Sequence, residues 1–191
     1  SGVSLCKQHL GVDAVHLLDP TMLLDVEDYI KLFKEAGVPK SSGNLFCYVL
    51  DKNPVVDNII NILEEDGFTP LYANLDTTPT TGNPRPVQLT TEEWLRGFYD
   101  AEFVVTDSFH ACVFSILFNK PFVVYGNIDR GISRVQSLLK MFNLNGRLVC
   151  STDEFIDNKD RIVSLSDAAK LNEIMSSLRE ESLAFIADVG L

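Results

Sequence analysis

Short apolar runs and helical patterns follow one another along most of this 191-residue chain. The runs at residues 45–50, 103–106 and 121–125 are continuously apolar, which is typical of strands buried on both faces. Between them, residues 54–66 and 109–118 carry apolar side chains at helical spacing. Because β-α-β units produce this alternation, the sequence predicts an α/β fold, a Rossmann-like parallel sheet with helices on both faces.

The remaining patterns extend the alternation. Thr90 and Glu93 have the spacing of a capping box that opens a short helix. Further elements are expected as a strand at 14–18, a helix at 26–36, a strand at 68–72 and a helix that begins near residue 133.

The length suits a single α/β domain over residues 1–191. Residues 74–86 are crowded with turn formers and predict a mobile loop, either an ordinary surface excursion or a flap over a ligand. Residues 168–187 predict a long terminal helix, which packs on its own sheet or reaches to another domain. No apolar run is long enough for a transmembrane segment and no signal segment opens the chain, so we expect a cytoplasmic protein.

The charge distribution bounds the class of ligand. A formal net charge of −11 argues against nucleic acid and anionic membranes as partners. Residues 118–147 nevertheless hold five basic side chains against one acidic one. This stretch is either where an anion binds or a solvated basic helix face. The scattered cysteines and histidines show no metal-ligand spacing, so we expect neither a metal nor a cofactor.

The segment Thr106-Asp107-Ser108-Phe109-His110 joins a predicted strand to a predicted helix. Ligands of open parallel sheets lie at such junctions, where the first turn of the helix offers unpaired N–H groups and the positive end of its dipole. In the alternative interpretation, Asp107 or Ser108 is only a helix N-cap and His110 is a core histidine.

Several stretches of the sequence, which follow one another along nearly the whole chain, resemble the polysaccharide pyruvyl transferase family. Two together carry the resemblance: Asp19-Pro20-Thr21-Met22-Leu23-Leu24 and the Thr106 to His110 element. The others are Asp28-Tyr29, Glu93-Trp94-Leu95, Phe114-Ser115-Ile116-Leu117-Phe118-Asn119-Lys120-Pro121-Phe122, Ser133-Arg134-Val135, Leu138-Leu139, Arg147, and Arg179 with Ser182 and Phe185-Ile186.

The resemblance implies a two-domain enzyme of glycosyltransferase-B type that moves the pyruvyl group of phosphoenolpyruvate onto sugar hydroxyls. Its product is a ketal on a bacterial surface polysaccharide, and its acceptor is a sugar or lipid-linked oligosaccharide. Only 18 residues precede Asp19. We therefore expect this chain to be the carboxyl-terminal domain, with a missing amino-terminal domain as its partner, and to be inactive alone.

Within that chemistry, His110 suits a general acid or phosphate ligand, since imidazole exchanges protons near neutral pH. Asp107 is expected to act as a base or to orient a hydroxyl, and Arg134 to pair with the carboxylate or phosphate of the donor. The other expected substrate-binding residues are Thr106, Ser108, Phe109, Asn127, Arg130, Asp19 and Thr21.

One departure leaves alternatives open. Many relatives have an arginine two residues before the motif histidine, where this chain has Ser108. The same architecture could instead bind a nucleotide-sugar in a glycosyltransferase, with Glu154 or Asp157 as candidates to hold the ribose hydroxyls. In a third interpretation, the chain is a non-catalytic α/β binding module.

Overall fold

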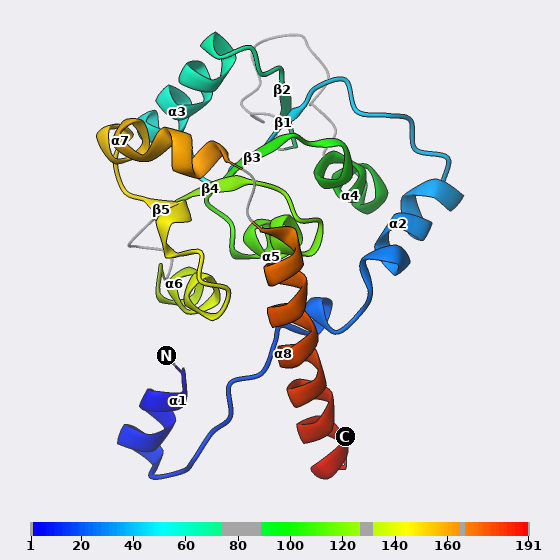
Figure 1. The fold of residues 1–191 in the computed structure, drawn as a ribbon, viewed down its shortest axis with the longest axis vertical. Helices are drawn as coiled ribbons and strands as arrows, with labels where there is room; N and C mark the ends of the chain where they lie inside the picture. Colours follow the sequence, from blue (N-terminus) through cyan, green and yellow to red (C-terminus); the bar gives the residue numbers. More distant parts are fainter. Residues whose placement is uncertain (1, 74–88, 127–131, 165–166, 191) are drawn as a thin grey trace, which may run out of the picture.

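The computed structural model describes residues 2–73, 89–126, 132–164 and 167–190. Within them, five parallel strands form one sheet in the order β2-β1-β3-β4-β5 (Figure 1). The strands are β1 (Leu45–Tyr48), β2 (Pro70–Tyr72), β3 (Phe103–Thr106), β4 (Phe122–Tyr125) and β5 (Leu148–Val149). The predicted α/β class with an all-parallel, Rossmann-like sheet is confirmed.

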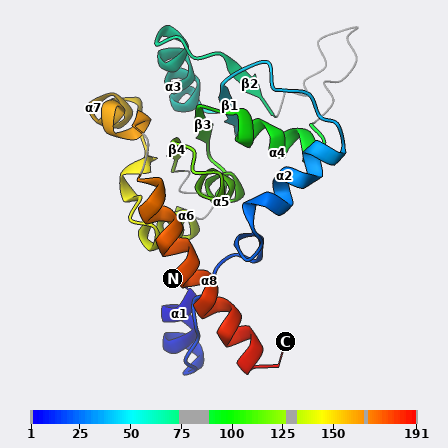
Figure 2. The ribbon, with the colours of Figure 1, turned by 45° about the vertical axis from the view of Figure 1, so that its right-hand side comes forward.

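Helices cover both faces of the sheet. Successive side chains of a strand point to opposite sides, so each face has its own apolar surface to bury. Leu45 and Cys47 of β1 lie in one core cluster, and Phe46 between them lies in the other. The Leu45 side is covered by α3 (Pro54–Glu65) and α7 (Thr152–Val163). The Phe46 side is covered by α4 (Thr91–Asp100), α5 (Phe109–Leu117) and α6 (Ile132–Met141), as Figure 2 shows from a second angle.

The strand order places a topological switch point between β1 and β3. The chain passes from β1 through α3 to β2 on one side, and then crosses back over β1 to reach β3. The connections that leave β1 and β3 therefore diverge to opposite faces of the sheet. In open α/β sheets such a divergence creates the crevice in which ligands bind.

The predicted strand at residues 14–18 is wrong. These residues have no regular structure, and they lead into a short 3₁₀ helix, η2 (Pro20–Met22). The Leu18 backbone N–H donates to the Ser182 hydroxyl oxygen at 3.1 Å. The Ser182 side chain therefore satisfies a backbone N–H group that would pair with a neighbouring strand if these residues formed one.

Other elements complete the chain. The capping box of Thr90 and Glu93 opens α4 as predicted, since each side chain accepts a hydrogen bond from the other's backbone N–H. The two-residue strand β5 and helix α7 were not predicted. The amino-terminal segment forms α1 (Gly2–Leu5) and η1 (Cys6–Leu10), and α2 (Val26–Glu35) packs beside α4.

The long terminal helix α8 spans Ala168–Asp188, where the sequence predicted a helix at 168–187. It extends away from the sheet in both views (Figures 1 and 2). The predicted loop at 74–86 lies outside the described residues. In the described part of the chain, every helix is too short or too polar to cross a membrane.

The packing of α4 on β1 gives a first prediction. A Cβ atom at Gly97 would lie 2.3 Å from a ring carbon of Phe46, which is almost fully buried. Overpacking of a core costs about 1–3 kcal/mol, more than the roughly 1 kcal/mol that Ala gains over Gly in a helix. We expect Gly97→Ala to lower the free energy of unfolding measured in urea.

Asn61→Ala on the exposed side of α3 is the matched control. It introduces the same residue into a helix without crowding, so its unfolding midpoint should stay the same or rise. An unchanged midpoint for Gly97→Ala would contradict the tight contact between α4 and β1.

Candidate functional site

The β3–α5 junction is built as a strand that ends at Thr106 and a helix that begins at Phe109. Ser108 is the N-cap residue, but its side chain makes no capping hydrogen bond. Its backbone N–H donates to the Thr106 hydroxyl oxygen at 2.9 Å. The first turn of α5 is therefore not capped by the Ser108 hydroxyl, and helix N-termini of this kind attract anions.

Thr106 and Asp107 tie β3 to the end of β1. The Thr106 hydroxyl donates to the Tyr48 carbonyl oxygen at 2.6 Å. The Asp107 carboxylate accepts the N–H groups of Leu50 and Asp51 at 2.8 and 3.0 Å. Both side chains are buried. These hydrogen bonds span the switch point, so Thr106 and Asp107 tie the β3–α5 junction to the end of β1.

Asp19 comes from the segment before η2 and faces His110. Its Oδ1 atom accepts the Thr21 backbone N–H at 3.1 Å and the Thr21 hydroxyl at 2.7 Å. Its Oδ2 atom lies 3.9 Å from His110 Nε2. This distance is too long for a direct hydrogen bond, and the two groups form an ion pair only when the imidazole is protonated. The His110 side chain is 56% exposed and so remains accessible to a ligand.

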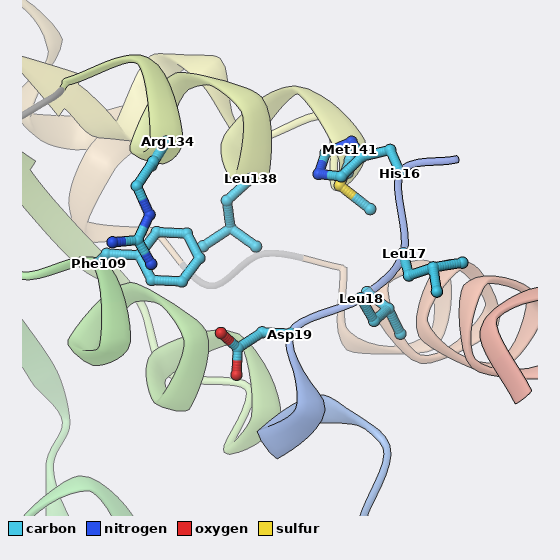
Figure 3. Close-up of a pocket in the computed structure, with 8 residues that line it drawn as sticks. All are labelled: His16, Leu17, Leu18, Asp19, Phe109, Arg134, Leu138 and Met141. Atoms are coloured by element: carbon cyan, nitrogen blue, oxygen red, sulfur yellow. The ribbon is translucent and has the colours of Figure 1, made fainter. Parts of the chain in front are cut away.

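Arg134 completes the arrangement from the first turn of α6. Its guanidinium carbon lies 4.4 Å from the centroid of the Phe109 ring. This cation–π contact places the positive charge of Arg134 over the first residue of α5. A pocket of about 160 Å³ opens between these elements (Figure 3). It is lined by His16, Leu17, Leu18, Asp19, Phe109, Arg134, Leu138 and Met141.

The pocket combines an apolar wall with charged groups of both signs. Leu138 and Met141 of α6 supply part of the apolar wall, and Asp19 and Arg134 approach from different elements. Small-molecule sites commonly have this composition, an apolar surface with a few convergent polar groups. The arrangement suits a small polar ligand that also carries an apolar part.

The structure brings together part of the predicted site. Asp19, Thr21, Phe109, His110 and Arg134 surround one region. Thr106 and Asp107 lie at the switch point, held by the hydrogen bonds described above. Asn127 and Arg130 lie outside the described residues.

The sequence did not indicate His16 or Met141 as pocket residues. His16 stands in a run that resembled a strand, where a histidine carries no distinctive signal. Leu138, by contrast, belonged to the predicted apolar stripe of its helix, which gave no sign that the stripe also lines a pocket. Spatial proximity of separate elements is the missing information in each case.

Cys112 of α5 is a buried thiol. Burial, together with the neighbouring Asp107 carboxylate, raises the pKa of the Cys112 thiol far above its usual range. Such a thiol is a poor nucleophile. Among the described residues, no three His, Cys, Asp or Glu side chains gather as metal ligands would.

Together, the fold and the pocket define an α/β protein with a candidate small-molecule site beside the first helix turn after β3. The family model described as polysaccharide pyruvyl transferase matches residues 2–130, more than half of the chain. The chain therefore belongs to the polysaccharide pyruvyl transferase family. The matched region includes Asp19 and His110 but ends before Arg134. Comparisons with curated proteins and with solved structures found no match.

The switch-point network gives a second prediction. Asp107→Asn keeps the shape of the side chain but offers a single acceptor oxygen to the two N–H donors of Leu50 and Asp51. The loss of a buried hydrogen bond of this kind costs about 1–3 kcal/mol. We expect a lower free energy of unfolding, measured by urea denaturation.

Asp153→Asn makes the same change of charge at an exposed position of α7 and should cost less. Equal stability of the two variants would mean that the Asp107 carboxylate does not hold the backbone of Leu50 and Asp51 after β1.

Proposed function

We propose that this protein takes part in pyruvyl transfer from phosphoenolpyruvate to sugar hydroxyls, in the synthesis of bacterial surface polysaccharide. The observation that supports this most directly is a small pocket lined by Asp19, Phe109 and Arg134, with His110 Nε2 3.9 Å from the Asp19 carboxylate. Family membership supplies the class of reaction. Because phosphoenolpyruvate is made in the cytoplasm, the proposal also implies a cytoplasmic enzyme.

The two anionic groups of phosphoenolpyruvate match two features in and beside the pocket. Arg134 can pair with a carboxylate in bidentate geometry. The first turn of α5, with Ser108 and His110, offers N–H donors and a dipole to the phosphate. The methylene carbon then rests near Phe109 on the apolar side.

The proposed reaction proceeds in balanced steps. His110 or a water beside it gives a proton to the methylene carbon, and the first sugar hydroxyl oxygen bonds to the central carbon. The second hydroxyl oxygen then displaces phosphate, breaking the bond between that carbon and the phosphate oxygen. The proton of the first hydroxyl replaces the one that was given to the methylene carbon, and the proton of the second leaves with the phosphate. The reaction therefore balances without a cofactor.

The geometry favours Asp19 over Asp107 for the carboxylate role. Both oxygens of Asp107 already accept backbone N–H groups. Asp19 keeps one oxygen directed toward His110. We therefore propose that Asp19 orients His110 or the attacking hydroxyl, and that Asp107 supports the fold of the site.

The nucleotide-sugar alternative has a weaker basis. One of its two candidate ribose ligands, Glu154, accepts the Cys150 backbone N–H at 2.6 Å while its own N–H binds Ser151, at the start of α7. This carboxylate serves the helix terminus. Tighter binding of a nucleoside diphosphate than of phosphoenolpyruvate would nevertheless favour the glycosyltransferase interpretation.

We further propose that a second, amino-terminal domain closes the site, with this chain as the carboxyl-terminal domain of a glycosyltransferase-B-type enzyme. Leu183, Phe185 and Val189 at the outer end of α8 are exposed, as are Leu10 and Val15 near the amino terminus. Apolar side chains in such number suit contact with another domain. The intact mass of the protein isolated from its source cells tests this, since a chain without a second domain would contradict it.

The proposed donor site gives a third prediction. Charge-assisted hydrogen bonds contribute about 1.5–3 kcal/mol each, or roughly tenfold to a hundredfold in affinity. We expect His110→Ala and Arg134→Ala each to weaken phosphoenolpyruvate binding by that factor, measured by calorimetric titration of the full-length protein.

Arg161→Ala removes an exposed guanidinium from α7 and should leave the affinity unchanged. Wild-type affinity in both site variants would reject the donor site. If polysaccharide modification also continued in His110→Ala, the non-catalytic binding module would become the better interpretation.

A further inference from the structure

The terminal helix α8 holds the segment that carries Asp19. Arg179 uses three donor nitrogens of its guanidinium on this segment. Nε donates to the Met22 carbonyl oxygen at 3.0 Å and Nη2 to the Leu24 carbonyl oxygen at 2.8 Å. Nη1 pairs with the Asp25 carboxylate at 2.5 Å. One side chain thus fixes the end of η2 and the start of α2.

Ser182 holds the other end of the same segment. Its hydroxyl oxygen accepts the Leu18 backbone N–H at 3.1 Å, while its hydrogen is donated to the Leu178 carbonyl oxygen of α8 at 2.7 Å. The side chain is buried, and it stands three residues after Arg179 on the same face of the helix. The backbone on both sides of Asp19 is therefore attached to α8.

A third contact comes from α2. The Tyr29 hydroxyl donates to the Thr21 carbonyl oxygen at 2.7 Å. Burial raises the pKa of Tyr29, and the Asp19 carboxylate raises it further, so this hydroxyl stays protonated and keeps donating. Tyr29 also packs edge-on against Phe114 of α5, which links the Asp19 segment to the helix that carries His110.

These contacts hold the segment that sets the direction of the Asp19 Oδ2 atom. Thr21 takes Oδ1 through two hydrogen bonds. Oδ2 is then directed to His110 Nε2 at 3.9 Å. Because Thr21 and Asp19 move with the segment, a shift of the segment relative to α5 would change this distance directly.

We propose that Arg179 and Ser182 are positioning residues, which hold the Asp19 carboxylate in place beside the His110 imidazole. The inference deepens the proposed function and rests on it for the chemical role of His110. A merely structural role would lower stability without any specific effect on His110. The proposal instead requires that the effect of Arg179 on His110 pass through Asp19.

The test records the ring proton and nitrogen resonances of His110 by NMR, in the wild-type protein and in three variants. Asp19→Asn removes the carboxylate charge from the Nε2 side of the ring. We expect Arg179→Met and Ser182→Ala to move these resonances in the same direction, because both release the segment that presents Asp19. Ser182→Ala is the milder change and keeps the test valid if Arg179→Met fails to fold.

The double variant Asp19→Asn/Arg179→Met isolates the coupling. Its His110 resonances should match those of Asp19→Asn alone. Arg147→Met is the matched control, because Arg147 also binds backbone carbonyl oxygens, those of Ile162 and Ser164, but does so around α7. It should lower stability and leave the His110 resonances in place.

Two results would overturn the proposal: unchanged His110 resonances in folded Arg179→Met and Ser182→Ala, or shifts that simply add in the double variant. These spectra contain no phosphoenolpyruvate, so they stand apart from the donor hypothesis, whose failure would appear as absent binding in the wild type. Where binding is present, turnover of Arg179→Met should fall roughly tenfold to a hundredfold, the scale expected when a reacting group is misplaced by about 1 Å.

Discussion

The hydrogen bonds of Asp107 to the backbone after β1 are the constraint on which the arrangement of the site depends. A flavodoxin-like strand order opens a crevice between β1 and β3, and ligands of such folds usually enter it. Here the buried Asp107 carboxylate ties the β3–α5 junction to the chain after β1 by accepting the N–H groups of Leu50 and Asp51. The same junction begins α5, the helix on which His110 and Phe109 meet Arg134 and the segment around Asp19.

Much of the fold could be predicted from the sequence because its signals are local. Continuous apolar runs identified β1, β3 and β4, and the capping box of Thr90 and Glu93 marked the start of α4. The prediction failed at residues 14–18, where the same apolar signal occurs without a strand. The difference is a partner distant in sequence: Ser182 of α8 accepts the Leu18 N–H that a neighbouring strand would otherwise bind. The two residues of β5 are too few to carry a periodic pattern.

The site could be predicted only in part. The junction from Thr106 to His110 was recognisable because strand, turn and helix are adjacent in the sequence. The family resemblance added Asp19, and the family model matches the region that contains both. The roles within the junction depend on contacts that the sequence does not contain, such as those that occupy Asp107. The position of Asp19 opposite His110 also depends on such a contact, because α8, at the other end of the chain, holds the Asp19 segment.

The central claim is that a small anionic donor binds between α5, α6 and the Asp19 segment. A crystal structure of the protein with phosphoenolpyruvate tests it most directly. We predict density for the ligand in the pocket of Figure 3, with one anionic group at hydrogen-bond distance from Arg134 and the other beside His110 and the first turn of α5. Density at the crevice between β1 and β3, or at a distant surface with this pocket empty, would contradict the account.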